Sequence, residues 1–442
     1  MTSRTLLRGG CVLTLGKKTP NFAAADVLIE DGRIAEVGSG VRARDAENVD
    51  ASETIVMPGF VDTHRHTWRS LFRNLGDAST NGEVVDPAKL GGQLQPDDVY
   101  AATLVGLLGA VEAGITTVVD WSDLPVDPAL AAAALQAHAD AGARTVFVRG
   151  LGEASNGGPR MPTRDVITRM REEVGPRTTI ALGLDLTSDG VGSNGDPVAL
   201  SRELGLRIHI HGGSSVPGSN AIARLAERGV LGSDVTLVHP FGLDDAAARA
   251  LASSGTSVSV TPSSEMAGGL RAPPIQLLID HDVRPALGVD DERVAPGDLF
   301  AQMRETISLQ HAVVFDRKLA GKAALPKLMS TRDVIRFATI DGAVAAGLHT
   351  VTGSLEPGKQ ADVVVLRTDR PNIYPINDPI GAVVWGMDTS NVGWVFAAGR
   401  ALVRDGVLDA DVERARALAM SARERVAAPG VLVVRSGAGG ER

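Results

Sequence analysis

The 442-residue sequence contains one cysteine, Cys11, and no apolar run long enough to cross a bilayer. Because a lone cysteine cannot form an intramolecular disulfide, nothing in the sequence indicates an oxidising compartment. The N-terminal segment also lacks the continuous apolar stretch of a signal peptide. With 44 Lys and Arg against 53 Asp and Glu, the formal charge is −9. This charge argues against general nucleic-acid binding, which needs a basic face. We therefore expect a cytoplasmic protein that acts on a small molecule and binds neither nucleic acid nor membrane; homo-oligomerisation is left open.

Aromatic side chains are also scarce, at 3%, whereas glycine is abundant, with 50 residues. This composition favours tight turns and close packing of helices against strands. A hydrophobic fraction of 44% with 22% charged residues is typical of a globular enzyme and excludes disorder as a description of the whole chain. The length corresponds to two or three domains, or to one large barrel with a smaller unit.

Short apolar segments rich in β-branched residues alternate along the chain with Ala- and Leu-rich helical segments. The predicted strands cover residues 60–64, 115–121, 144–150, 178–185, 207–211, 235–240, 257–262 and 284–290. The predicted helices cover residues 96–113, 128–141, 163–174, 220–228, 244–253, 274–280 and 297–313, with a weaker signal between 185 and 207. Alternation of this kind indicates a parallel α/β sheet, and eight strands close a (β/α)8 TIM barrel. We assign residues 58–350 to this catalytic barrel.

The two ends of the chain have a different pattern. Residues 5–15, 25–38, 361–367 and 392–404 are typical of antiparallel strands, and Asp31-Gly32 is a hairpin turn signal. They predict a small β-sandwich domain built from residues 1–57 and 351–410, with the barrel inserted between its halves. Residues 411–442 are predicted to be a C-terminal tail, helical to about residue 427.

Metal-ligating side chains gather where the predicted barrel strands end, which is the face on which barrel active sites lie. They are His64 and His66 after the first strand, His209 and His211 after the fifth, His239 after the sixth and Asp290 after the eighth. Because residues i and i+2 of a strand share a face, His64 and His66 can reach one ion. Imidazole and carboxylate ligands suit a divalent metal, and such a set fits Zn²⁺ or Fe²⁺.

Two distant motifs carry a family resemblance. The segment VMPGFVDTHRH at residues 56–66 resembles the opening barrel strand of the amidohydrolase superfamily, in particular its cytosine deaminase and triazine hydrolase branch. The segment GSLEPGKQAD at residues 353–362 resembles the place where that superfamily's chain leaves the barrel for its β-sandwich. The resemblance implies one metal ion held by His64, His66, His211 and Asp290. It also implies that His239 is a catalytic residue that orients or polarises the attacked group.

The number of metal ions can be judged from a missing residue type. Binuclear members of the superfamily bridge their metals with a carboxylated lysine on the fourth strand. This sequence has no lysine between Lys89 and Lys318, so that bridge is excluded and a single ion, Zn²⁺ or alternatively Fe²⁺, is the better interpretation. The choice between His209 and His211 as the fifth-strand ligand remains open.

One position departs from the resemblance. The mononuclear deaminases carry a proton-shuttling Glu three residues after the fifth-strand His, whereas position 214 is Ser. The Ser214 hydroxyl cannot replace a carboxylate as general base. We predict that Glu265, at the end of the seventh strand, supplies a catalytic carboxylate, with Asp290 alone as the competing candidate.

Other residues near the strand ends are given ordinary roles. Surface solvation is the expectation for Asp291 and Glu292, and a solvated helix face for Arg69 and Arg73. Asp123 could form part of a pocket wall, with an ordinary structural role favoured. Trp68 and Trp121 could stack on a planar substrate, with core packing as an equal alternative.

The leading functional interpretation is a metal-dependent amidohydrolase. It would use a metal-activated water to hydrolyse a C–N bond, as deaminases do, or a related bond in a small heterocyclic compound. The alternative is a metal-dependent lyase, hydratase or isomerase on the same fold, which would not need the Glu that Ser214 replaces. A catalytically silent binding protein is disfavoured because it would have no physical need for a complete ligand set.

Overall fold

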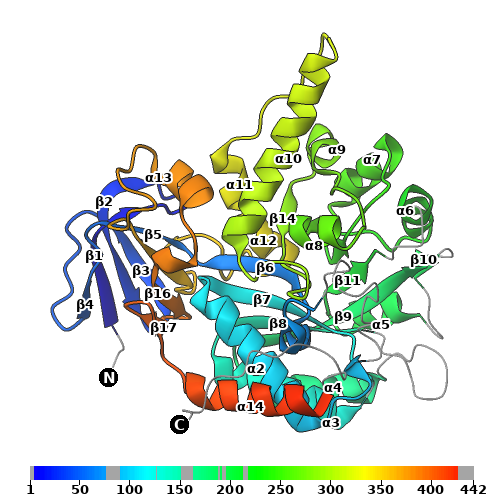
Figure 1. The fold of residues 1–442 in the computed structure, drawn as a ribbon, viewed down its shortest axis with the longest axis horizontal. Coiled ribbons are helices and arrows are strands. Elements are labelled where there is room, and N and C mark those ends of the chain that lie inside the picture. The colour runs from blue at the N-terminus through cyan, green and yellow to red at the C-terminus, as the bar shows by residue number, and fades with distance from the viewer. Residues whose placement is uncertain are drawn as a thin grey trace, which may run out of the picture.

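The computed structural model describes residues 4–75, 90–125, 127–150, 163–187, 190–191, 196–212 and 218–426 (Figure 1). Two sheets organise this part of the chain, one within the barrel and one formed by the two ends. Ser214 lies outside the described residues, as do the last residues of the predicted tail, 427–442.

The barrel contains all eight predicted strands. They are β6 (Phe60–Arg65), β7 (Ile115–Ser122), β8 (Arg144–Arg149), β9 (Thr178–Thr187), β11 (Ile208–His211), β12 (Val235–Val238), β13 (Ser257–Val260) and β14 (Pro285–Leu287). The strands pair in parallel in chain order, and a short strand, β10 (Gly190–Val191), pairs only with β9. The ring closes through a parallel bridge between Arg65 and Asp290. The expected (β/α)8 TIM barrel is therefore confirmed.

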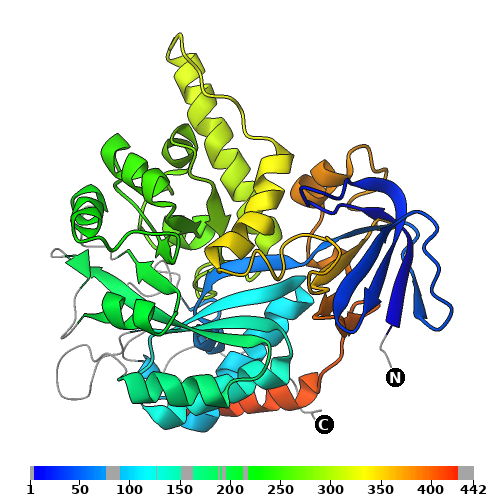
Figure 2. The ribbon, with the colours of Figure 1, turned by 180° about the vertical axis from the view of Figure 1, so that it is seen from behind.

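Helices cover the outside of the barrel (Figure 2). They are α2 (Pro96–Glu112), α3 (Pro128–Ala141), α4 (Arg164–Glu173), α5 (Pro197–Glu203), α6 (Gly218–Glu227), α7 (Asp245–Ser254), α9 (Ile275–Asp280) and α10 (Leu299–Leu319). The side chains of Asp127, Asp196, Asp244 and Asp298 accept backbone N–H groups at the starts of α3, α5, α7 and α10. Such caps satisfy amides that have no partner inside a helix. Helix α10 runs six residues beyond the predicted end at 313, to Leu319.

The two ends of the chain form the second sheet. Its strands are β1 (Arg4–Val12), β2 (Phe22–Glu30), β3 (Arg33–Gly38), β4 (Glu47–Asp50), β5 (Thr54–Pro58), β15 (Val363–Arg367), β16 (Val392–Ala397), β17 (Arg400–Arg404) and β18 (Val407–Leu408). Asp31 and Gly32, with φ of 46° and 78°, make the turn between β2 and β3. Buried side chains from strands along this sheet pack in one cluster. A buried ion pair between Arg144 and Asp362, at 2.7 Å, ties this sheet to the barrel.

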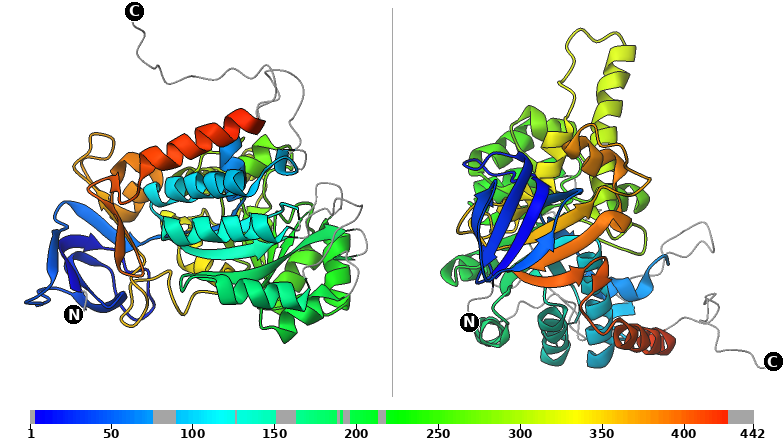
Figure 3. Two further views of the ribbon diagram at one scale, coloured as in Figure 1. Left: turned by 90° about the horizontal axis from the view of Figure 1, so that it is seen from below. Right: turned by 90° about the vertical axis from the view of Figure 1, so that its left-hand side faces the viewer.

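Helix α14 (Val412–Val426) lies along α2 at the edge of the barrel (Figure 3). Arg425 on α14 donates to buried Asp98 on α2, with Nε at 3.0 Å. The division into units at residues 1–57 with 351–410, 58–350 and 411–442 remains a prediction. Within the part of the chain described, no helix has the length and apolar character needed to span a membrane.

Several short helices were not predicted. They are η1 (Thr67–Phe72), α8 (Pro262–Ala267), α11 (Thr331–Phe337), α12 (Ile340–Ala345), α13 (Pro379–Gly381), η2 (Ala382–Gly386) and η3 (Thr389–Asn391). Two of them, η1 and α8, follow barrel strands directly and carry residues that line the site.

Candidate active site

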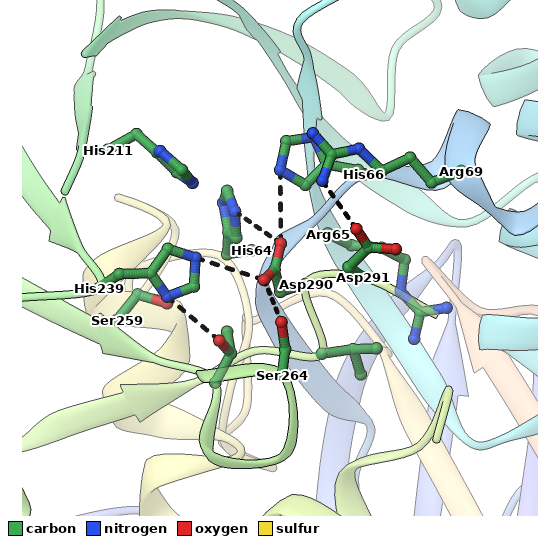
Figure 4. A network of polar contacts seen from close by, with 12 residues as sticks. His64, Arg65, His66, Arg69, His211, His239, Ser259, Ser264, Asp290 and Asp291 are labelled. Carbon is green, nitrogen blue, oxygen red and sulfur yellow. Dashed lines mark hydrogen bonds and ion pairs between the residues drawn. The ribbon is translucent and has the colours of Figure 1, made fainter. Parts of the chain in front are cut away.

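The predicted ligands come together at the carboxyl end of the barrel (Figure 4). Asp290 is the centre of the group: its Oδ1 lies 3.4 Å from Nε2 of His64 and 3.4 Å from Nε2 of His66. Its Oδ2 lies 3.5 Å from Nε2 of His239. The His211 ring faces the same space, with its centroid 5.2 Å from that of His64 and 4.9 Å from that of His239.

The backbone around this group is unusually constrained. Asp290 and His239 have φ of 65° and 53°, in the left-handed region that residues other than glycine rarely adopt. The Asp290 amide donates to the His64 carbonyl at 2.8 Å, and the His66 amide donates to the Asp290 carbonyl at 3.0 Å. The same hydrogen bonds therefore close the barrel and place the carboxylate between the two histidines. Such conformations persist where the surrounding structure enforces them, often at functional sites.

The strands on either side approach one another closely because two positions are glycine. A Cβ on Gly288 would lie 2.8 Å from both the amide nitrogen and the carbonyl oxygen of His64. A Cβ on Gly212 would lie 2.4 Å from the carbonyl oxygen of His239. Side chains at either position would push the ligand-bearing strands apart.

The donor atoms of this group fit a divalent cation. Nε2 of His64, His66 and His239 and Oδ1 of Asp290 are buried without a hydrogen-bond partner. Leaving so many buried polar atoms unpaired is costly, and a metal would satisfy them together. Two overlapping sets have ligand atoms close enough to share one ion: His64, His66 and Asp290, and His64, His211 and His239.

The charge states also suit metal binding. Burial lowers the pKa of His64 to about 3, against the opposing effect of Asp290. Burial likewise lowers the pKa of His211 well below its usual value. For Asp290, burial raises the pKa, but His239, His64 and His66 outweigh it and hold the pKa well below the ordinary range. Neutral imidazoles beside an ionised carboxylate are the forms that coordinate a metal.

The two candidate histidines of the fifth strand occupy different places. His211 belongs to a potential ligand set, whereas His209, two residues earlier on β11, does not. His209 is fully buried, and both of its ring nitrogens lack a hydrogen-bond partner. Among the described residues, the grouping favours His211 as the fifth-strand ligand.

Glu265 lies in helix α8 and not at the end of the seventh strand, which corrects its expected position. Pro262 begins α8 directly after β13, so the chain turns there and brings Glu265 back toward His239. Its Oε1 lies 3.0 Å from Nδ1 of His239 and accepts the Thr261 amide at 2.9 Å. Ser264, and not Glu265, donates to Asp290. Burial lowers the pKa of His239, but the carboxylates of Asp290 and Glu265 raise it by more, so the net shift is upward.

The expectation of a solvated Arg69, Asp291 and Glu292 is wrong. Arg69, on η1, joins Asp123 to Asp291, with Nη1 donating to Asp291 at 2.8 Å. Asp123 also faces Nδ1 of His66 at 3.3 Å, which orients that ring. Glu292 is 7% exposed and is paired with Arg65 and Arg73. The pairs of Asp291 with Arg69 and of Glu292 with Arg65 and Arg73 join residues over two hundred positions apart, and those of Asp123 join residues more than fifty apart, which local sequence patterns do not reveal.

The two tryptophans near the site belong to the core. Trp68 and Trp121 are 3% and 2% exposed. Trp68 donates its indole N–H to Asp123 at 2.7 Å. The Trp121 ring centroid lies 5.6 Å from that of His64 and 5.1 Å from that of His211. Both therefore support the metal-ligand residues rather than offer an open stacking surface.

One acidic residue of the site was missed in the sequence. Asp185, near the end of β9, is the register partner of His211 on β11, and its Oδ1 lies 3.7 Å from Nδ1 of His211. Its side chain is 54% exposed, at the rim of the barrel. The surrounding protein, and then the negative charge of Asp123, raise the pKa of Asp185 to about 6. Its position at a strand end is the signal that could have identified it.

Comparison with known proteins gives a consistent family assignment. A model of the amidohydrolase family matches residues 55–402. A 5'-deoxyadenosine deaminase from Methanothermobacter thermautotrophicus is 30% identical over 410 residues, covering 87% of this chain and 90% of the relative. A 5-methylthioadenosine/S-adenosylhomocysteine deaminase from Symbiobacterium thermophilum is 27% identical over 429 residues, covering 91% and 94%.

Solved structures share the fold. A triazine hydrolase variant superposes with a TM-score of 0.80 at 20% identity, covering 95% of this chain and 99% of the other. An adenosine deaminase from Xanthomonas campestris with bound zinc gives a TM-score of 0.79 at 19% identity, covering 96% and 98%. At 19–20% identity, these similarities show that the fold is shared and nothing further.

Proposed function

The chain belongs to the amidohydrolase family, and we propose that it is a mononuclear deaminase of a small amino-substituted heterocycle. It is a metal-dependent hydrolase of carbon–nitrogen bonds other than peptide bonds. The observation that carries the proposal is the set of buried, unpartnered ligand atoms around Asp290. Deamination is favoured because two of the relatives described above are named as deaminases of adenine nucleosides.

The proposed ligands of one zinc ion, with iron as the alternative, are His64, His66, His211 and Asp290. A divalent ion bound there would act as a Lewis acid and lower the pKa of a coordinated water toward neutrality. The protein's share is to hold the imidazoles of His64 and His211 neutral and the carboxylate of Asp290 ionised. Asp123 and the two backbone hydrogen bonds of Asp290 keep these ligands oriented.

His239 and Glu265 are proposed to act as a pair. The Glu265 carboxylate holds Nδ1 of His239, so that Nε2 points into the site toward Asp290. An imidazole oriented in this way can donate a proton to, or hydrogen-bond, the group under attack. Glu265 acts through His239 in this arrangement, while Asp290 is placed to accept a proton from an attacking water.

The serine at position 214 is the reason to consider a second candidate function. Because the deaminase Glu is replaced there, a lyase, hydratase or isomerase that needs no such proton shuttle remains the alternative. Release of ammonia separates the two classes of reaction.

The test uses purified full-length protein loaded with Zn²⁺ or Fe²⁺. Elemental analysis should give one tightly bound ion per chain, and ammonia should be released from at least one compound of a panel of adenine nucleosides, cytosine and amino-triazines. His211→Ala should lose the metal, whereas His311→Ala should keep it, since His311 bonds to the Met329 carbonyl at 2.9 Å outside the site. Two tightly bound ions per chain would refute the single-metal site, and turnover of the panel without ammonia would refute deamination.

A further inference from the structure

We propose that Asp185 contacts the substrate at the open side of the metal site and accepts a hydrogen bond from a substrate N–H group. The enzyme would thereby select compounds with an amino or amidine group close to the attacked carbon. This inference rests on the proposed function, because it takes the substrate to bind over the histidine and aspartate cluster.

The exposures of the site residues show which side is open. The side chains of His64, His66, His239 and Asp290 are 0%, 2%, 1% and 9% exposed. The side chain of His211 is 26% exposed and that of Asp185 54%. Among the described residues, the exposed side of the cluster therefore lies at the ends of β9 and β11, and we infer that a ligand reaches the buried, unpartnered atoms from there.

The register of these strands directs Asp185 toward that opening. Asp185 and His211 are paired positions of neighbouring parallel strands. Gly183, two residues earlier on β9, shares the face of Asp185, and a Cβ there would lie 3.0 Å from the Trp121 ring. That ring contacts His64 and His211 inside the barrel. Asp185 thus stands above the interior, on the same side as the ligands.

Among the described residues around the opening, the other carboxylates outside the ligand set already accept hydrogen bonds from protein donors. Asp123 faces His66 and accepts from Trp68 and Arg69. Glu265 accepts from the Thr261 amide and faces His239.

The other two carboxylates of this part of the structure form ion pairs with arginines. Asp291 pairs with Arg69 and Arg293, and Glu292 with Arg65 and Arg73. The contact of Asp185 with His211, at 3.7 Å, is longer than a hydrogen bond. Its oxygens keep the capacity to receive a ligand donor.

The chemistry of the acceptor identifies the ligand class. An ionised carboxylate accepts hydrogen bonds and donates none, so it favours a substrate edge that carries N–H groups. A substrate edge made of ether or carbonyl oxygens would leave the carboxylate unpaired on binding. Sites built to hydrogen-bond a ligand group discriminate strongly against analogues that lack it.

The experiment compares two triazines of similar outline as binding probes. Melamine presents three amino groups, and 2,4,6-trimethoxy-1,3,5-triazine presents no N–H donor. Calorimetric titration of the metal-loaded protein should show melamine bound at least about tenfold more tightly. Asp185→Asn should weaken melamine binding about tenfold and Asp185→Ala about 10- to 100-fold, with little change for the trimethoxy compound.

Asp316→Asn is the matched control, since it removes the same charge from an exposed position of α10. It should leave both titrations unchanged. Equal binding of the two probes, no binding of melamine, or unchanged melamine binding in Asp185→Ala would each overturn the inference. Selective binding of melamine without ammonia release from any amino-heterocycle would refute the deaminase but support the Asp185 contact. Deamination with unchanged kcat and KM in Asp185→Ala would support the deaminase but refute the Asp185 contact.

Discussion

The pairing of Glu265 with His239 gives a prediction in which charge and hydrogen bonding can be separated. One oxygen, Oε1, serves both partners: it lies 3.0 Å from Nδ1 of His239 and accepts the Thr261 amide at 2.9 Å. In Glu265→Gln the amide oxygen can keep both contacts, and only the charge is lost. In Glu265→Ala the Thr261 amide is left unsatisfied in a place where the wild-type residue is 1% exposed, while Nδ1 of His239 keeps only the Thr261 hydroxyl, at 3.2 Å.

The two variants should therefore differ in stability. An unsatisfied buried donor costs about 1–3 kcal/mol, so Glu265→Ala, which removes the acceptor of the Thr261 amide, should lower the free energy of unfolding by about 1–3 kcal/mol. Glu265→Gln should lie within about 1 kcal/mol of wild type. Urea unfolding at equal metal content, followed by tryptophan fluorescence, measures both values.

Turnover should respond to the lost charge alone. A hydrogen bond to a charged group is worth about 1 kcal/mol more than a neutral one, and about 1.4 kcal/mol is a factor of ten in rate. Glu265→Gln should therefore lower kcat about fivefold with its metal retained. Glu305→Gln is the control, because Glu305 bonds to Ser263 on the outer side of α8 at 2.6 Å and should leave kcat unchanged. A Gln variant with wild-type kcat, or one as unstable as the Ala variant, would refute the reasoning.

Three further predictions concern the metal, the buried ion pairs and the thiol. Asp290→Asn should lose metal and turnover together, whereas His239→Ala should retain metal and lose about 10²–10⁴-fold in kcat; equal metal loss in both, measured by elemental analysis, would contradict their separate roles. Arg65→Met should cost about 3–5 kcal/mol in urea unfolding, because it leaves Asp62 buried without its cation and removes one of the two arginines that pair with Glu292. Arg202→Met at the surface pair with Asp234 should cost at most about 1 kcal/mol, and similar losses in the two variants would count against this account. Burial raises the pKa of the Cys11 thiol above its usual value. Since the thiolate is the reactive form, alkylation at pH 7.5 should be slower in the folded protein than in urea and should accelerate as the pH rises. Equal rates in the folded and unfolded protein would contradict it.

Local patterns predicted the barrel strands, the longer helices and the candidate ligand residues. Alternating apolar and helical segments indicated eight parallel strands, and histidines at their ends indicated a metal site. These features could be predicted from the sequence because the buried face of a strand, the cap of a helix and the end of a strand are each set by residues within a few positions of one another. The absence of lysine between residues 89 and 318 excluded a bridging lysine in the same direct way.

The contacts that orient the site depend on closure of the barrel. Arg69 joins Asp123 and Asp291, and Asp290 meets His64 and His66, only because the first and last strands come side by side. Glu265 reaches His239 because α8 turns the chain directly after β13. Burial then decides the charge states, which depend on the surroundings of each group and not on its residue type.

Asp185 illustrates what the sequence predicted and what only the tertiary structure showed. The sequence alone placed residue 185 at the end of a predicted strand, where a side chain can line a barrel's active site. Only the tertiary structure paired it with His211 and left its carboxylate at the open side of the metal site. The strand positions follow from hydrophobic patterning along the chain, whereas the role of Asp185 follows from side chains that closure of the barrel brings together.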